Sequence, residues 1–241
     1  MERIPDRGEP DRYAEQNFQP SGFLEIRSNE YVEVEMQYPI LGMRNAEAQC
    51  FVREEVYERL MRAAKTLPQG MKFKILDAWR PFALQKELFE VYSARIIRDF
   101  RLQDCEEEER NAVIRKYVCD PIFDRDIPPV HTTGGAVDLT LIGADGVELD
   151  MGTGFDAFTE KTHTAYFERL GDDCLNGNAR MIRENRRLLY HTMTSAGFVN
   201  YPSEWWHFDY GDRFWGFYEK KSALYRGVFT KEEIYGGSKE K

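Results

Sequence analysis

The chain has 241 residues, with 33 Lys and Arg against 42 Asp and Glu, a formal net charge of −9, and 42% hydrophobic and 14% aromatic residues. This length and composition are typical of a globular chain with one sizeable core, so they predict a single domain and exclude a disordered chain. The acidic balance argues against a nucleic-acid partner, because binding to phosphates needs clustered Lys and Arg, and no basic stripe occurs here.

The sequence shows neither a secretory signal nor a membrane-spanning segment. Residues 1–19 are charged and lack the apolar run of a secretory signal, and no run of 18 apolar residues occurs anywhere. We therefore expect a cytoplasmic protein with no membrane partner. Residues 1–30 are expected to form a loosely ordered arm and residues 236–241 a frayed tail, which leaves 31–235 as the domain.

The first half of the domain alternates between helix and strand. Apolar residues at helical spacing predict a helix over Ala46–Leu67, which Pro68-Gln69-Gly70 ends. Met71–Ala78 alternates apolar residues with lysines, as a half-buried strand does. A second helix is expected over Ala83–Phe100, and an acidic, exposed helix over Glu106–Val118.

After a proline-rich loop, the second half predicts two strands and a helix. Ala136–Ile142 (AVDLTLI) reads as a buried strand with one carboxylate in it. A helix is expected over Ala179–Ala196, closed by Gly197, and an aromatic strand over Trp205–Tyr210. Short turns before aromatic strands favour antiparallel pairing, so we predict an α+β fold with a mainly antiparallel central sheet flanked by helices.

Two of the four histidines stand beside carboxylates in a pattern that suits a metal. His131 is followed by a glycine pair, which lets the backbone turn tightly, and then by Asp138 on the next strand. Glu204 precedes His207 by three residues. Two imidazoles and one carboxylate as ligands, with a further carboxylate spare, are the inventory of a catalytic zinc site that keeps one position open for water.

The spacing of Glu204 and His207 requires a local turn. In an extended strand these two side chains would point to opposite faces, so the chain must turn near Glu204 for both to reach one metal, and Pro202-Ser203 makes this turn plausible. The H-E-x-x-H motif on a helix does not occur, which excludes a thermolysin-type site.

Arg80 comes at the end of a predicted strand, in Asp77-Ala78-Trp79-Arg80-Pro81. A guanidinium held there can stabilise the oxyanion that forms when water attacks a carbonyl. Asp77 has two readings: it binds substrate, or it holds Arg80 or caps a turn.

Four strings of the sequence, in matching order, carry a family resemblance: DAWRP, HTTGGAVDLTL, DMGTGFD and GFVNYPSEWWHFDYG. They resemble the zinc D-alanyl-D-alanine dipeptidases associated with vancomycin resistance, within the wider group of lysostaphin, D-Ala-D-Ala peptidase and hedgehog-like folds. The resemblance extends from Tyr38 to Tyr210. It implies a zinc hydrolase of the cell-wall dipeptide D-Ala-D-Ala, or of related D-amino-acid dipeptides, within the same α+β fold.

The resemblance also implies roles for individual residues. His131, Asp138 and His207 would hold one Zn²⁺ per chain. Glu204 would be the general base that takes a proton from the attacking water and delivers it to the leaving amine.

Three more positions match substrate-contacting residues of the family. Arg80 would face the scissile carbonyl, Asp156 would bind the free α-amino group of the substrate, and Tyr38 would contact the substrate. One position departs from the pattern: Pro129 stands where the family has a small polar residue, so any substrate hydrogen bond made there is lost.

Two other functions remain open from the sequence. One is a D,D-carboxypeptidase or endopeptidase that acts on peptidoglycan stem peptides, which Asp156 disfavours because a carboxylate that anchors a free ammonium selects unblocked dipeptides. The other is a non-catalytic, zinc-stabilised binding module of the same fold, against which Glu204 and Arg80 speak, because a structural zinc site needs neither.

The remaining candidate residues have simpler readings. His163 and His191 are expected to be a solvated residue and a helix residue without metal, and the run CEEEER at 105–110 is expected to be a solvated helix face. Trp205 and Trp206 either fill the core or line the substrate cleft. The four cysteines form no C-x-x-C pair, so free thiols are expected at Cys50, Cys105, Cys119 and Cys174.

Overall fold

The computed structural model describes residues 1–11, 14–171 and 176–236. A five-stranded sheet lies at its centre, with the strands in the order β2-β4-β5-β7-β6. Only the edge pair β2–β4 is parallel, and the other neighbours are antiparallel, so the prediction of an α+β fold with a mainly antiparallel sheet is confirmed. The sheet consists of β2 (Val32–Val34), β4 (Lys72–Asp77), β5 (Ala136–Ile142), β6 (Val199–Asn200) and β7 (His207–Asp209).

Two long helices pack with the sheet to form the main core. These are α2 (Glu54–Ala64) and α6 (Gly177–Ser195), which contribute Leu60 and Leu189 to a cluster that also contains Ile75 of β4 and Leu139 of β5. Each of these four side chains is nearly inaccessible to solvent. The burial of such side chains, about 1.5–3 kcal/mol each, fixes the sheet that carries the site residues.

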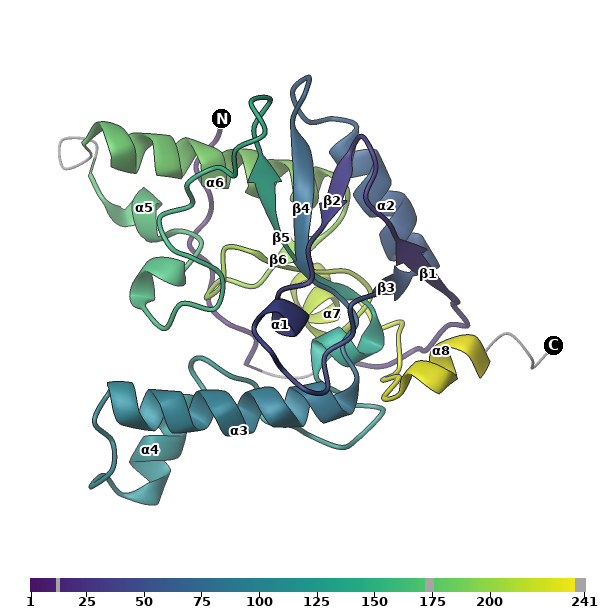
Figure 1. Cartoon of the computed structure of the whole chain (residues 1–241), viewed down its shortest axis with the longest axis vertical. Coiled ribbons are helices and arrows are strands. Elements are labelled where there is room, and N and C mark those ends of the chain that lie inside the picture. Colours follow the sequence, from purple (N-terminus) through teal and green to yellow (C-terminus); the bar gives the residue numbers. More distant parts are fainter. Residues whose placement is uncertain (12–13, 172–175, 237–241) are drawn as a thin grey trace.

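A second, smaller core lies between α3 (Phe82–Asp99) and α4 (Glu107–Ile114). Figure 1 shows this helical pair on one side of the molecule, apart from α6 on the other. Leu88 and Ile96 of α3 pack there with Ile114 of α4 and with Tyr38 from the short helix α1 (Gln37–Ile40). The cavity described below lies between this helical pair and the central sheet.

The remaining elements are short. They are β1 (Phe23–Ile26), β3 (Cys50–Arg53), η1 (Val130–Thr133), η2 (Glu160–Thr162), α5 (Tyr166–Arg169), α7 (Arg213–Glu219) and α8 (Lys231–Gly236). No helix in the described ranges is both long enough and apolar enough to cross a membrane.

Several predicted elements have nearly the expected bounds. β5 covers Ala136–Ile142 as predicted, and every residue in it is buried. The helix predicted over Ala83–Phe100 is α3, and the one predicted over Ala179–Ala196 is α6. Gly197 follows α6 with a φ of 94°, the left-handed backbone expected of a residue that ends a helix.

The helix predicted over Ala46–Leu67 is wrong in its first part. Cys50–Arg53 is the strand β3, which pairs antiparallel with β1, and α2 begins only at Glu54. All four residues of β3 are buried, so their pattern is compatible with both a helix and a strand. The pairing with β1 identifies this segment as a strand. Glu54 and Glu55 lie in the first turn of α2, where carboxylates favour the start of a helix.

Two further expectations need correction. The strand predicted over Trp205–Tyr210 is shorter, because β7 covers only His207–Asp209 after a turn at Glu204. Residues 1–30, expected to be a loosely ordered arm, contain β1, and Ile4 among them is only 1% exposed. Residues 237–241 of the expected tail lie outside the described residues, as does Cys174.

Candidate active site

A cavity of about 160 Å³ opens where the ends of β4, β5 and β7 face the helical pair. Its wall contains every residue to which the sequence assigned a ligand, catalytic or substrate-binding role: Tyr38, Arg80, His131, Asp138, Asp156, Glu204 and His207. These residues come from separate parts of the chain, so the fold brings them together as the sequence predicted.

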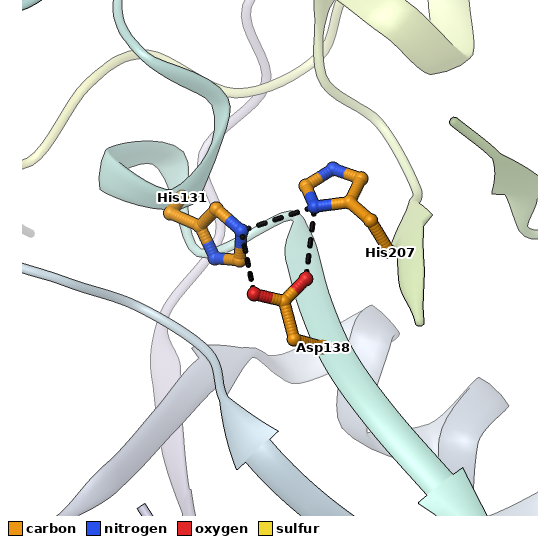
Figure 2. Close-up of side chains that lie close together, drawn as sticks. All are labelled: His131, Asp138 and His207. Carbon is orange, nitrogen blue, oxygen red and sulfur yellow. Dashed lines mark hydrogen bonds and ion pairs between the residues drawn. The ribbon is translucent and has the colours of Figure 1, made fainter. Parts of the chain in front are cut away.

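The three expected metal ligands converge at one point of this cavity. Asp138 Oδ1 lies 2.9 Å from His207 Nδ1, and Asp138 Oδ2 lies 3.3 Å from His131 Nε2. One ligand atom from each residue lies within 4.8 Å of the others, and all three residues are buried (Figure 2). Asp138 and His207 are directly opposed across the antiparallel pair β5–β7, which explains why they meet.

The turn before β5 brings His131 to the same place. Gly134 has a φ of 74°, and a Cβ on it would lie 2.3 Å from the ring of Phe23. Only glycine fits this combination of backbone angle and close contact. The glycine pair noted in the sequence therefore reverses the chain from η1, which carries His131, into β5, which carries Asp138.

In each imidazole, the outer nitrogen, which points away from the ligand cluster, lies within hydrogen-bond distance of an acceptor. His131 Nδ1 lies 2.7 Å from the carbonyl oxygen of Ala78, and His207 Nε2 lies 2.8 Å from Asp209 Oδ1. These acceptors require an N–H on each outer nitrogen, which leaves the inner nitrogens, His131 Nε2 and His207 Nδ1, free to bind a metal.

The charge of this cluster favours a cation. Burial works against the protonated form of His207, but the charges of Asp209 and Asp138 outweigh it and raise the pKa of His207 well above its usual range. The inner nitrogens lie only 3.1 Å apart, beside an anionic carboxylate. A divalent cation satisfies all three acceptors at once, so the donor set fits a metal.

Asp209 is a site residue that the sequence analysis missed. It is fully buried, and it stands two positions after His207 on β7. Residues at positions i and i+2 of a strand share a face, so this spacing was the signal that could have identified it.

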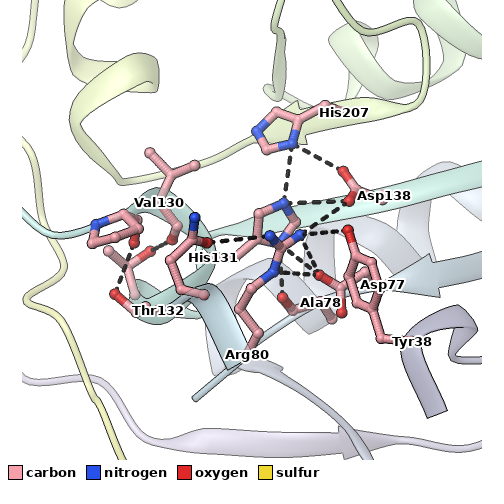
Figure 3. Close-up of polar contacts among 12 residues, drawn as sticks. Tyr38, Asp77, Ala78, Arg80, Val130, His131, Thr132, Asp138 and His207 are labelled. Atoms are coloured by element: carbon pink, nitrogen blue, oxygen red, sulfur yellow. Dashed lines mark hydrogen bonds and ion pairs between the residues drawn. The ribbon is translucent and has the colours of Figure 1, made fainter. Parts of the chain in front are cut away.

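Arg80 is held at the edge of the ligand cluster by a network of polar contacts (Figure 3). Its Nε donates to Asp77 Oδ2 at 2.8 Å, and its Nη1 donates to Gln85 Oε1 at 3.2 Å. Its Nη2 lies 3.6 Å from Asp138 Oδ2. Of the two readings of Asp77, the geometry matches the one in which it holds Arg80.

Asp156 lies at another part of the cavity wall and accepts two phenol hydroxyls. Tyr38 Oη donates to Asp156 Oδ2 at 2.9 Å, and Tyr92 Oη donates to the same oxygen at 2.7 Å. Burial raises the pKa of Asp156 to about 6. Tyr92 lies on α3, and the helical periodicity that predicts this helix carries no signal that the Tyr92 hydroxyl reaches the site.

Glu204 follows the turn that the sequence required. Its backbone N–H donates to the carbonyl of Tyr201 at 3.1 Å, and its carboxylate Oε2 lies 3.8 Å from His207 Nδ1. Its side chain is 29% exposed, so it reaches the cavity from the solvent side. Burial raises the pKa of Glu204 to about 8.

Other residues singled out in the sequence lie outside the ligand cluster. His191 Nε2 lies 2.8 Å from the carbonyl oxygen of Glu2, on α6. Trp205 and Trp206 are 3% and 2% exposed and belong to the main core. Cys50 and Cys119 are free thiols, and Pro129 and Cys119 lie in the cavity wall.

Residues 38–225 match the family of D-Ala-D-Ala dipeptidases. This chain belongs to that family. The match includes every residue of the cavity wall that the sequence had singled out. It confirms the resemblance seen in the sequence and makes the chain a metallopeptidase of this dipeptidase family.

Two relatives, both D-alanyl-D-alanine dipeptidases, agree with this assignment. A D-alanyl-D-alanine dipeptidase of Synechocystis sp. is 29% identical over 88% of this chain and 86% of its own length. The D-alanyl-D-alanine dipeptidase of Escherichia coli is 30% identical over 68% of each chain. A solved structure of the vancomycin resistance D,D-pentapeptidase VanY in complex with Zn(II) has a TM-score of 0.41 and 17% identity, and the likeness covers 88% of this chain and 93% of that one.

Proposed function

We propose that this chain is a zinc-dependent dipeptidase that hydrolyses D-Ala-D-Ala or a closely related D-amino-acid dipeptide. The observation that carries the proposal is the inward-facing set of acceptors on His131, Asp138 and His207, because the outer nitrogen of each imidazole is already committed to another acceptor. Three protein ligands that leave a fourth position open are typical of catalytic zinc. Zinc in such a site activates water and polarises the carbonyl that is attacked.

Glu204 is the residue best placed to move protons. It lies beside the ligand cluster, 3.8 Å from His207 Nδ1, and it is not itself needed as a ligand. Burial raises its pKa to about 8 in the metal-free chain, and the charge of a bound cation would lower it toward neutral pH, where an acid–base group both accepts and releases a proton readily. Glu204 takes a proton from the attacking water and passes it to the leaving amine.

Arg80 stabilises the negative charge that develops on the carbonyl oxygen. Its guanidinium is buried, faces the cavity and is fixed by Asp77 and Gln85, so it needs little reorganisation when the charge forms. Its 3.6 Å separation from Asp138 Oδ2 places it next to the proposed metal ligands.

Asp156 selects the substrate by its free ammonium group. Its carboxylate is oriented by Tyr38 and Tyr92 and lines the same cavity as Arg80 and Glu204. A cavity of about 160 Å³ suits a small dipeptide, and a buried carboxylate pairs well with the ammonium of an unblocked one. An N-acylated stem peptide has no such ammonium.

The discriminating experiment compares free D-Ala-D-Ala with N-acetyl-D-Ala-D-Ala on the zinc-loaded protein. We expect release of D-alanine from the free dipeptide, with a kcat/KM at least 100-fold above that for the acetylated one, because the latter leaves Asp156 unpaired. Preference for the acetylated substrate would show a carboxypeptidase or endopeptidase. No turnover of either would show a zinc-stabilised binding module.

A further inference from the structure

The N-terminal segment contacts the turn at residues 201–204, which carries Glu204. Residues 4–9, which we call the N-terminal strap, lie against α5, α6 and α7. The backbone N–H of Ile4 donates to Glu168 Oε1 at 3.2 Å, and the buried Ile4 side chain packs with Ala165 and Tyr190. At the other end, Tyr218 Oη donates to the carbonyl of Gly8 at 2.8 Å. These anchors fix the position of the next residue, Glu9.

Glu9 contacts the turn directly. Its Oε1 accepts a hydrogen bond from the hydroxyl of Ser203, the residue immediately before Glu204. Ser203 is only 6% exposed, so its hydroxyl is directed at Glu9 rather than at bulk solvent. The carboxylate also lies near Tyr201 at the start of the turn: after burial, the charge of Glu9 is the next largest cause that raises the pKa of the Tyr201 phenol.

Glu204 depends on this turn for its position. Within the described residues, no side chain or backbone group donates a hydrogen bond to the Glu204 carboxylate, whose Oε2 lies 3.8 Å from His207 Nδ1. The backbone of the turn is fixed elsewhere by Asn200 Nδ2, which donates to the carbonyl of Glu204 at 3.1 Å, and by the N–H of Thr164, which donates to the carbonyl of Pro202 at 2.9 Å. Backbone hydrogen bonds such as that from the N–H of Trp205 to the carbonyl of Thr162, at 3.0 Å, also hold the turn. The Ser203 hydroxyl adds a side-chain contact to these supports, and Glu9 is its partner.

We propose that Glu9 is a positioning residue for catalysis: through Ser203 it holds the turn so that the Glu204 carboxylate faces the metal site. The inference rests on the proposed role of Glu204 as general base. A displacement of an acid–base group by a fraction of an ångström to 1 Å lowers the rate without removing any group that touches the substrate. The N-terminal strap is therefore a working part of the active site.

The test is a double-mutant cycle on the full chain with Glu9→Ala, Ser203→Ala and the double variant, assayed with zinc and D-Ala-D-Ala. We expect each single variant to lower kcat about 5–10-fold, as for the loss of one hydrogen bond of ordinary strength, with KM within about twofold and zinc content unchanged. The double variant should be no slower than either single one, because both remove the same contact. Glu9→Gln, which keeps an acceptor oxygen, should recover at least half of the activity.

The matched control is Glu2→Ala, since Glu2 is an exposed glutamate near the start of the same segment and has no described side-chain contact. It should leave kcat unchanged. Independent effects that multiply in the double variant would overturn the inference, as would an effect confined to KM, a Glu9→Gln variant as slow as Glu9→Ala, or an equal loss in Glu2→Ala.

A second readout separates this inference from the proposed function. Hydrogen–deuterium exchange on the full chain should show faster exchange over residues 198–206 in Glu9→Ala and Ser203→Ala, but not in Glu2→Ala. Unchanged exchange in that segment would reject the strap contact even if the enzyme is active. If Glu9→Ala and Ser203→Ala show faster exchange but Glu204→Gln keeps full turnover, Glu204 is not the base. The positioning role of Glu9 is then rejected as well.

Discussion

Asp138 and His207 face each other across β5 and β7, with Asp138 Oδ1 2.9 Å from His207 Nδ1. The antiparallel register therefore brings together two of the three proposed metal ligands before any loop contributes. The other ring nitrogen of His207 is held by Asp209, whose Oδ1 lies 2.8 Å from Nε2.

Asp209 should control the affinity for zinc without touching the metal. Asp209→Ala removes the acceptor that orients His207, so we expect the dissociation constant for zinc to rise about 10–100-fold, as for other carboxylates behind a ligating histidine. Asp209→Asn should lose less, because the amide oxygen can still accept from Nε2. Competition with a chelator measures both values, and Asp145→Asn on an exposed loop is the control. Equal affinities for Asp209→Ala and the unmodified protein would contradict this role.

Glu204 should matter for turnover and not for metal binding. Glu204→Gln keeps the shape of the side chain but removes its ability to accept a proton, so we expect bound zinc to remain and kcat to fall by about 10²–10⁴-fold. Metal analysis and steady-state kinetics on the same preparation check both parts. Glu58→Gln, on the exposed face of α2, is the matched control and should be fully active. Full activity of Glu204→Gln would remove Glu204 as the base.

Arg80 should act on the transition state more than on substrate binding. Arg80→Ala removes the guanidinium that faces the carbonyl oxygen, so kcat is expected to fall about 10²–10³-fold while KM changes little. It also leaves the buried Asp77 without its partner, so thermal unfolding must be measured alongside the kinetics. Arg95→Ala, on the exposed side of α3, is the control. An effect confined to KM would refute the oxyanion role.

Asp156 should make the activity fall at acidic pH. Burial raises its pKa to about 6, so below that pH the carboxyl is protonated and cannot pair with the ammonium of a dipeptide. We expect KM for D-Ala-D-Ala to rise as the pH falls through about 6 in the unmodified protein. In Asp156→Asn, KM should be high at every pH, and this dependence should be absent.

The raised pKa of Asp156 also makes the stability of the folded chain depend on pH. A carboxyl whose pKa is higher in the folded state favours folding while it is protonated, and this contribution is lost as the pH rises through about 6. Asp156→Asn should therefore reduce the loss of stability between about pH 4 and 7, measured as the free energy of unfolding of the metal-free protein. An unchanged pH dependence of both KM and stability would contradict the assignment.

The sequence predicted that His131, Asp138 and His207 lie together, and it predicted much of the sheet, because these signals are local. The glycine pair after His131 and the continuous apolar run of β5 fix the positions of His131 and Asp138, and the turn residues before Glu204 follow from the need to bring Glu204 and His207 to one metal. Family resemblance added Asp156 and Tyr38, which local pattern alone did not connect.

What the sequence missed depends on contacts between distant segments. Tyr92 and Gln85 both lie on α3, where periodicity predicts a helix but not that the Tyr92 hydroxyl meets Asp156 or that the Gln85 amide meets Arg80. The sequence predicts helix for the residues of β3, because the partner strand β1 lies in a segment expected to be loosely ordered. It gives no signal for Glu9, since only the folded chain brings Glu9 to Ser203.

One zinc ion, held by His131, Asp138 and His207, is proposed to make this chain a dipeptidase. A titration of metal-stripped protein with Zn²⁺, while D-alanine release from D-Ala-D-Ala is followed, tests this most directly. We predict no turnover without metal and a linear rise that levels off at one zinc per chain, with no rise in Asp138→Ala. Full turnover in the metal-stripped protein, or none at one bound zinc per chain, would contradict the claim.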